Sequence, residues 1–369
     1  MKKCFRSVPA VLVWAAGLLS PLSGTANPGP QTHTSALGRG SPTQNFALGA
    51  PSPTLIGLRE EPIGRSAFPS GVPGVPQPSV GLHTIDAETP QGLQDLFAPG
   101  PDVLPLVSAH RGGAAKDFPE NCIATFEETL RHCWSMLEID PRYTKDHVLV
   151  LNHDPTLGRT TSGSGRVADH TLAALKQLRL KDLQGNLTEH RMPTLDEALE
   201  WARGKTILVL DNKDVPIPDL VRKIEEHHAK AYAMVMAYSF DAIKQCHAAN
   251  PNIMMEIMVG DQKRLEAFDK TGVPWRNVIA FVGHTPPQEA GLCEQIHAKG
   301  ARCLAGTSRN IDLRFLKGRA ERMELLEPDY RALLKLGVDV IETDIPRQVG
   351  PLLYAGHPVP ASKAKYFRK

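Results

Sequence analysis

The chain has 369 residues, a formal net charge of +2 and 41% hydrophobic residues, a length that suits one large domain or two ordinary ones. The small charge gives no support for binding nucleic acids or membrane surfaces through bulk electrostatics, and the hydrophobic fraction excludes a wholly disordered chain. Proline and glycine are unevenly distributed, because 12 of the 31 prolines and 11 of the 30 glycines lie within residues 27–100. Only the part from Pro101 onward has the composition that can bury a large core.

The first 26 residues have the pattern of a secretory signal peptide. A basic opening precedes an apolar run at residues 8–19, and the small residues Gly24 and Ala26 follow it. The run is shorter than the roughly 20 residues that span a bilayer, so we expect cleavage near Ala26 and no transmembrane span in the mature chain. The expected location is the periplasm or the exterior of the cell. A buried helix or an uncleaved anchor is the alternative interpretation.

Residues 27–100 show no sustained helical or strand period and contain no lysine. Their composition is typical of a flexible spacer, with one helical turn expected at 92–97 before the folded part. A tail that wraps around the folded domain is the alternative interpretation.

From Val103 onward, short β-rich runs alternate with longer stretches of helical periodicity. The expected strands are 104–109, 136–140, 206–210, 232–237, 253–258, 278–282, 302–305 and 338–343, with a hairpin of 143–144 and 148–152 after the second. The expected helices are 122–133, 195–203, 218–228, 241–249, 262–269, 288–298 and 319–336. Eight repeats over about 260 residues favour a (β/α)₈ barrel at 101–360 over an open sheet. No glycine-rich phosphate loop of the nucleotide-binding type supports the open sheet.

Ionisable side chains interrupt the apolar runs where the strands end. They are His110 and Arg111 after the first strand, Glu138 and Asp140 at the second, His153 and Asp154 after the hairpin, Asp211 and Lys213 at the third, and Glu342 and Asp344 at the eighth. Because active sites of such barrels lie at the carboxyl ends of the strands, we expect these side chains to meet there.

Glu138 and Asp140 are two residues apart on a strand, so their carboxylates point to the same face. Neighbouring carboxylates repel each other, and a divalent cation removes the conflict. Oxygen ligands suit Ca²⁺ or Mg²⁺, and Asp211 on the next strand is the natural third ligand. A solvated or salt-bridged strand end is the alternative interpretation.

His110 and His153 are candidates for a general acid and a general base, because their ordinary pKa permits both roles near neutral pH. Arg111 and Lys213 place positive charges in the same region, and both side chain types bind phosphate oxygens. A cation site, two positive side chains and an acid–base pair together indicate cleavage of a phosphate ester.

These motifs resemble those of the glycerophosphodiester phosphodiesterase family. The matching runs are Ala-His-Arg-Gly at 109–112, Pro-Glu-Asn at 119–121, Glu-Ile-Asp at 138–140, Thr-Lys-Asp at 144–146, His-Asp at 153–154, Thr-Thr-Ser-Gly-Ser-Gly-Arg-Val at 160–167 and Met-Pro-Thr-Leu-Asp-Glu-Ala at 192–198. They occur in the family's order across residues 107–213, and a looser match follows at 337–346.

The resemblance implies a TIM barrel that hydrolyses glycerophosphodiesters to glycerol 3-phosphate and an alcohol with a divalent metal. It makes His110 and His153 the acid–base pair and Glu138 and Asp140 ligands of the metal. It also implies that Arg111 and Lys213 contact the phosphate. The family's third metal ligand is usually a glutamate two residues before the lysine, whereas this chain has the shorter Asp211. Residues 155–193 match the family's small insertion beside the barrel.

Five further carboxylates are weaker candidates: Glu120, Asp154, Glu256, Glu342 and Asp344. Two other functions stay open at this point. A phospholipase D-like or inositol-lipid phosphodiesterase on the same barrel requires an apolar rim, for which Met254, Met255 and Phe281 are candidates. A non-catalytic surface or binding protein has only the Asp211 substitution in its favour.

Overall fold

The structure is a computed structural model that describes residues 81–319 and 322–369. The predicted signal peptide at 1–26 and most of the predicted spacer at 27–100 lie outside the described residues. Within the described part of the chain, no helix is both long enough and apolar enough to cross a membrane.

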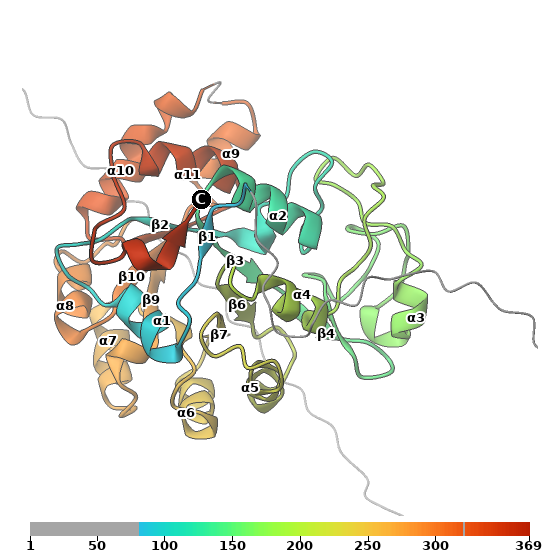
Figure 1. Ribbon diagram of the computed structural model, residues 1–369, viewed down its shortest axis with the longest axis horizontal. Helices are drawn as coiled ribbons and strands as arrows, with labels where there is room; N and C mark the ends of the chain where they lie inside the picture. The colour runs from blue at the N-terminus through green and yellow to red at the C-terminus, as the bar shows by residue number, and fades with distance from the viewer. Residues whose placement is uncertain (1–80, 320–321) are drawn as a thin grey trace, which may run out of the picture. The chain divides into compact units, whose positions relative to one another are not determined.

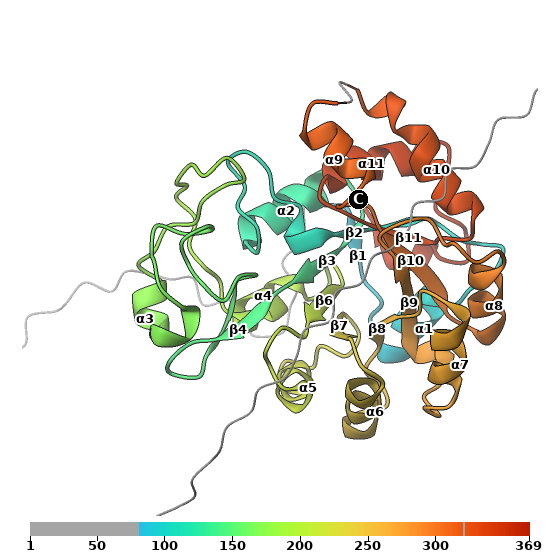
Figure 2. The ribbon, with the colours of Figure 1, turned by 180° about the vertical axis from the view of Figure 1, so that it is seen from behind.

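Eight parallel strands close into a barrel, which confirms the predicted (β/α)₈ fold (Figures 1 and 2). Neighbours along the chain pair in order, and the last barrel strand pairs with the first, with Val340 opposite Leu106. In chain order the barrel strands are β2 (Leu106–Ala109), β3 (Ser135–Ile139), β6 (Leu208–Asp211), β7 (Ala233–Ala237), β8 (Met255–Met258), β9 (Val278–Gly283), β10 (Arg302–Gly306) and β11 (Val340–Thr343).

The strands read as almost continuous apolar runs because both of their faces are buried. Leu106 and Met136 pack inside the barrel, whereas their neighbours Val107 and Leu137 pack against the surrounding helices. The alternation brings Glu138 onto the interior face, two residues after Met136, where the strand ends. The interior is therefore apolar in its lower layers and acidic at the carboxyl end.

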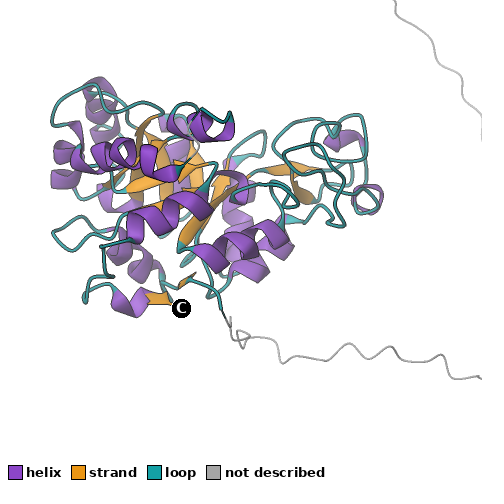
Figure 3. Cartoon of the chain, turned by 90° about the horizontal axis from the view of Figure 1, so that it is seen from above, coloured by secondary structure: helices purple, strands orange, loops and turns teal. Residues whose placement is uncertain are grey.

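The helices form the outer layer, which Figure 3 shows around the ring of strands. A capping box at Thr194 and Glu197 begins α4, which lies within the helix expected at 195–203. The single helix predicted over 319–336 is wrong, because a 3₁₀ turn at Met323–Leu325 separates the preceding segment from the helix that starts at Glu327. The helices are α1 (Pro90–Phe97), α2 (Ile123–His132), α3 (Leu172–Leu175), α4 (Leu195–Ala202), α5 (Ile217–Glu226), α6 (Phe240–Ala249), α7 (Gln262–Asp269), α8 (Leu292–Lys299), α9 (Ile311–Leu316), α10 (Glu327–Lys335) and α11 (Pro346–Tyr354).

The insertion between β3 and β6 projects to one side of the barrel, near α2 and α4 (Figures 1 and 2). It follows the antiparallel hairpin of β4 (Pro141–Tyr143) and β5 (Leu149–Leu151). Its residues Leu157 and Met192 form a small apolar core together with Val150 of the hairpin and Cys122 beside α2. The insertion is thus a packed unit that borders one side of the barrel mouth.

The opposite end of the barrel is closed by the two ends of the described domain. Strand β1 (Thr84–Ile85) pairs with β12 (Phe367–Arg368), and Phe97 of α1 packs with the lowest interior layer. The helical turn expected at 92–97 is confirmed as part of α1, whereas the spacer was expected to extend too far, because the folded domain already begins with β1 and α1 at residues 84–97. Apolar side chains at helical spacing, Leu93 and Leu96 among them, are fully buried there.

Candidate active site

A cavity of about 560 Å³ opens at the carboxyl ends of the barrel strands. Its wall contains most of the side chains predicted from the sequence: His110, Arg111, Glu138, His153, Asp211, Lys213, Glu256, Glu342 and Asp344. Asp140 is fully buried beside the cavity and contacts Lys213, whereas Glu120 and Asp154 contact the groups that line it. The fold therefore brings the predicted residues together at one end of the barrel.

A tight turn after β2 presents His110 and the backbone of Arg111 to the cavity. Arg111 has φ +53° and Gly112 has φ +83°, and a Cβ at Gly112 would lie 2.3 Å from the Phe126 ring. This left-handed turn directs the backbone N–H of Arg111 to Glu138 Oε2 at 2.7 Å. The glycine thus allows the chain to turn closely enough to hold a carboxylate of the site through the main chain.

His110 is oriented by Asp344, which follows β11. The Nδ1 atom of His110 lies 2.6 Å from Asp344 Oδ1, so Nε2 is the ring nitrogen left available to a substrate. Burial acts to lower the pKa of His110, but the hydrogen bond to Asp344 and the charges of Glu342 and Asp344 outweigh it and raise the pKa. His110 is therefore disposed to carry a proton.

The position of Asp344 is fixed by a buried network on α9 and α10. Asp312 Oδ2 accepts hydrogen bonds from the backbone N–H of Asp344 and from Thr343 Oγ1, both at 2.8 Å. Tyr330 donates its hydroxyl to Asp312 Oδ1 at 2.6 Å. These hydrogen bonds thus hold Asp344, and with it the carboxylate beside His110, in a fixed position.

His153 lies between β5 and the insertion and has its own aspartate. Its Nδ1 atom lies 2.7 Å from Asp154 Oδ1, and Arg159 forms a salt bridge with the same aspartate at 2.6 Å. Burial lowers the pKa of His153 and outweighs the opposing effects of Asp154 and Asp140. The two histidines therefore have similar hydrogen-bond partners but opposite pKa shifts.

Glu138, Asp140 and Asp211 bring one carboxylate oxygen each to within 4.8 Å of one another. All three are buried, and burial together with the charges of Asp140 and Asp211 raises the pKa of Glu138 well above its ordinary value. Burial works against the charged form of Asp140 too, but Lys213 and a hydrogen bond from Asn121 lower its pKa. Three crowded acidic groups of this kind require positive charge nearby.

The donor set fits a hard divalent cation. Lys213 Nζ lies 3.0 Å from Asp140 Oδ1 without hydrogen-bond geometry, so this buried oxygen has no hydrogen-bond donor. Asp211 contacts Lys213 and accepts the Tyr238 hydroxyl at 2.8 Å. A set of oxygen ligands, without sulfur or nitrogen, suits Ca²⁺ or Mg²⁺. The lone pairs of Asp140 Oδ1 accept no hydrogen bond and are available to such an ion.

Two more buried carboxyl groups face the same cavity from β8 and β11. Both oxygens of Glu256 are without a hydrogen-bond partner. Burial and the charges of Glu342 and Asp211 raise the pKa of Glu256 well above its ordinary value. Burial also raises the pKa of Glu342, although His110 opposes that shift. These groups add to the acidity of the cavity wall.

Several side chains of the site were not predicted. Asn121 donates Nδ2–H to Asp140 Oδ2 at 2.6 Å, and Tyr238 holds Asp211 from the end of β7. His284 and Arg309 line the far side of the cavity. The Pro-Glu-Asn motif contained the signal for Asn121, whereas Tyr238 follows an apolar strand with no other polar signal.

The apolar rim considered from the sequence is not formed by the residues proposed for it. Met254 and Met255 are fully buried in the barrel wall, and Phe281 is 3% exposed at the side of the cavity. These three side chains therefore do not present a surface to lipid.

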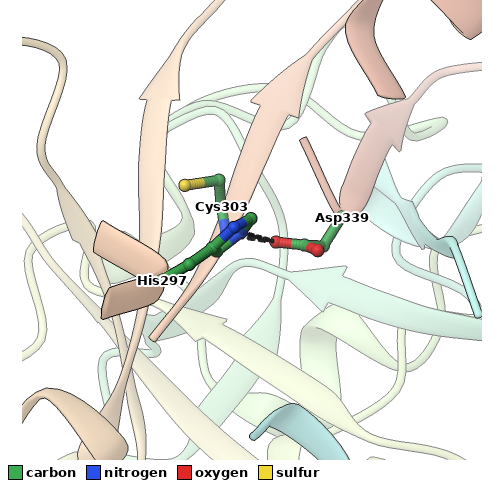
Figure 4. A group of neighbouring side chains, drawn as sticks. All are labelled: His297, Cys303 and Asp339. Carbon is green, nitrogen blue, oxygen red and sulfur yellow. Dashed lines mark hydrogen bonds and ion pairs between the residues drawn. The ribbon is translucent and has the colours of Figure 1, made fainter. Parts of the chain in front are cut away.

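A second group of potential ligands lies at the opposite end of β10 and β11 (Figure 4). Asp339 Oδ2 lies 2.7 Å from His297 Nε2 and accepts the backbone N–H of Cys303 at 2.8 Å. The sulfur of Cys303 points away from Asp339 in Figure 4. The arrangement joins α8 to two strands and is accounted for by its hydrogen bonds.

Comparisons with known proteins agree with the geometry. The model of the glycerophosphoryl diester phosphodiesterase family matches residues 110–348. A glycerophosphodiester phosphodiesterase from Caldanaerobacter subterraneus subsp. tengcongensis is 31% identical over 262 residues, which cover 68% of this chain and 98% of the relative. The crystal structure of a glycerophosphoryl diester phosphodiesterase from Parabacteroides distasonis is similar at a TM-score of 0.74 and 38% identity, over 78% of this chain and 100% of that one.

A phosphodiesterase from Oleispira antarctica, solved in complex with the product sn-glycerol-3-phosphate, shares the fold. Its TM-score is 0.51 at 24% identity, over 68% of this chain and 97% of that one. The family match runs from the end of β2 into α11 and so takes in nearly the whole barrel. The chain therefore belongs to the glycerophosphoryl diester phosphodiesterase family and is a phosphoric diester hydrolase.

Proposed function

We propose that the chain hydrolyses glycerophosphodiesters to glycerol 3-phosphate and an alcohol, with a divalent cation and with His110 and His153 as the acid–base pair. One observation carries the proposal. Both histidines are held through Nδ1 by an aspartate, and both line the cavity that also contains the crowded carboxylates. Held in this way, each ring offers Nε2 to a substrate phosphate in that cavity.

The phosphodiester is held by positive charge. Arg111 and Lys213 line the cavity and neutralise phosphoryl oxygens, the arginine through a planar fork and the lysine as a point charge. Glu138, Asp140 and Asp211 would hold a Ca²⁺ or Mg²⁺ ion, which supplies further positive charge to the phosphate when bound. The shorter Asp211 already accepts a hydrogen bond from Tyr238, so its orientation is fixed before an ion binds.

The surroundings of the two histidines support different roles for them. The raised pKa of His110 favours the imidazolium form, so His110 protonates the leaving alkoxide. The lowered pKa of His153 favours the neutral ring, so His153 removes the proton from the attacking hydroxyl. At His153, burial and the positive charges of Arg111 and Lys213 lower the pKa. At His110, the hydrogen bond to Asp344 and the charges of Glu342 and Asp344 raise it against the effect of burial.

Release of glycerol 3-phosphate from glycerophosphodiesters with choline, ethanolamine and glycerol head groups tests the proposal. Each reaction is run with the full chain as purified, after EDTA treatment, and after Ca²⁺ or Mg²⁺ is restored. We expect product in the first and third conditions and a loss in the second. Absence of product in all three, with no effect of chelator, would favour a non-catalytic binding protein.

We also propose that the protein is exported, on the strength of the signal-peptide pattern in residues 1–26. N-terminal sequencing of the protein from a bacterial expression host tests this. A mature chain beginning near residue 27 supports export, and a chain that retains its first residues contradicts it.

A further inference from the structure

Arg159, on the first loop of the insertion, joins two parts of the site that the reaction uses separately. Its Nη1 and Nη2 atoms donate to the two oxygens of Glu120, both at 2.8 Å. Its Nε and Nη2 atoms donate to the two oxygens of Asp154, at 2.6 and 2.9 Å. A single guanidinium group therefore holds two carboxylates, each through both of its oxygens.

Each of these carboxylates leads to a different functional side chain. Glu120 Oε2 accepts a hydrogen bond from Arg111 Nη1 at 3.2 Å, and Asp154 Oδ1 lies 2.7 Å from His153 Nδ1. Arg159 thus connects, through one carboxylate each, the phosphate-binding arginine and the histidine proposed as general base. It does not line the cavity itself, so it acts through these neighbours.

The loop that carries Arg159 is fixed by its own hydrogen bonds. Leu157 donates its N–H to Gly165 O at 3.0 Å, and Thr160 Oγ1 donates to Asn152 Oδ1 at 2.8 Å. The guanidinium therefore starts from an anchored backbone, and its planar fork loses less side-chain entropy per hydrogen bond than a flexible ammonium group would.

An exposed salt bridge usually contributes little to stability, and the Arg159 side chain is 46% exposed. Its partner Glu120 is buried, however, and the paired parallel hydrogen bonds give the contact a defined geometry. Arg159 therefore contributes more to the orientation of the site than to the stability of the fold.

We propose that Arg159 is a positioning residue, through which the insertion aligns His153 and Arg111 for the same phosphate. The inference rests on the proposed function of the site. It also gives the insertion a role in the reaction, because a shift of the 157–165 loop displaces both groups together.

The removal of Arg159 also has a consequence for pH dependence. The charges that act on His153 are those of Asp154 on its own loop, Asp140 directly after β3, Arg111 after β2 and Lys213 after β6. Without Arg159, the charge of Asp154 is no longer balanced and favours the protonated ring. A general base must be neutral, so the acid limb of the kcat/KM profile moves to higher pH.

The test compares full-length wild type with Arg159→Ala, Arg159→Lys and the control Arg166→Ala. Arg166 lies in the same insertion and its side chain is exposed. We expect Arg159→Ala to lose about 10- to 100-fold in kcat/KM, as is typical for groups that orient a site through a neighbour. We expect Arg159→Lys to recover only part of this, because one ammonium cannot span two carboxylates, and Arg166→Ala to match wild type.

Added guanidinium chloride at low millimolar concentration separates positioning from a structural role. We expect it to restore activity to Arg159→Ala, while sodium chloride at equal ionic strength does not, and we expect the acid limb to be displaced as described. Wild-type kcat/KM and an unmoved acid limb in Arg159→Ala would overturn the inference. So would a loss that neither guanidinium nor Arg159→Lys relieves and that is accompanied by a lower Tm. An inactive wild type would instead refute the proposed function.

Discussion

Replacement of Asp344 by asparagine tests the assignment of His110 as the general acid. The carboxylate lies 2.6 Å from His110 Nδ1, and its charge and hydrogen bond both raise the pKa of that ring. An asparagine keeps the shape of the side chain but removes the charge, and its amide can face the ring with an N–H donor. The imidazolium form of His110 then loses its main support.

The size of the effect follows from the contact. A hydrogen bond to a charged group contributes about 1.5–3 kcal/mol. Because about 1.4 kcal/mol corresponds to a tenfold change in rate, kcat/KM is expected to fall by roughly 10- to 150-fold. The fold should be unaffected, since Asp312 holds Asp344 through the backbone N–H.

The assay is glycerol 3-phosphate release as a function of pH, with Asp169→Asn, an exposed position of the insertion, as the matched control. A general acid must be protonated, so a lower pKa of His110 moves the alkaline limb of kcat/KM to lower pH. An Asp344→Asn variant with a rate within twofold of wild type and an unmoved alkaline limb would refute the assignment.

Three further predictions concern the same end of the barrel. His110→Ala should abolish turnover with little change in Tm, and a near-normal rate would exclude the acid–base mechanism. Lys213→Met leaves Asp140 and Asp211 without their shared ammonium group, so urea unfolding in EDTA should show a loss of roughly 3 kcal/mol, and added Ca²⁺ should recover part of it. An equal loss with and without Ca²⁺ would contradict the cation site. Gly112→Ala should lower stability by about 1–3 kcal/mol or more, because a positive φ and the Phe126 ring both oppose a Cβ. The control Gly185→Ala has a similar φ but no atom within 4 Å of its Cβ, so thermal unfolding should show a smaller loss.

The barrel could be predicted from the sequence because its strands are buried on both faces. Each strand therefore reads as an apolar run, and the ionisable residue that ends the run identifies the carboxyl end of the strand. Glu138 and Asp211 are recognisable in this way from the sequence alone. The expected order of the strands places these two residues on neighbouring strands of the barrel.

The parts that were missed depend on contacts between distant segments. The pairing of β1 with β12 joins Ile85 to Phe367, and two-residue strands carry no periodic signal. Helix α11 contains Gly350 and Pro351, residues that usually interrupt helices, yet the glycine allows close packing against Cys133. Local propensity therefore pointed away from structures that packing stabilises.

In the site, too, some features could be predicted from the sequence and others depend on contacts between distant segments. The residue types of His110 and His153 indicated their chemistry, but their opposite pKa shifts arise from burial at His153 and from the Asp344 carboxylate at His110, which depend on the folded chain. Tyr238 reaches Asp211 only because β7 lies beside β6. Sequence patterns thus identify reactive groups better than the neighbours that adjust them.

The pairing of β1 with β12 has a practical consequence for the orientation of the enzyme. Both ends of the described domain leave the barrel at the end that α1 closes, away from the cavity. A bead, sensor chip or fusion partner attached after Lys369 would therefore face the closed end and leave the mouth open to solvent. Immobilisation through the C-terminus should accordingly preserve substrate access, whereas coupling through Lys181 on the insertion would place the support beside Glu120 and Arg159, which contact the site.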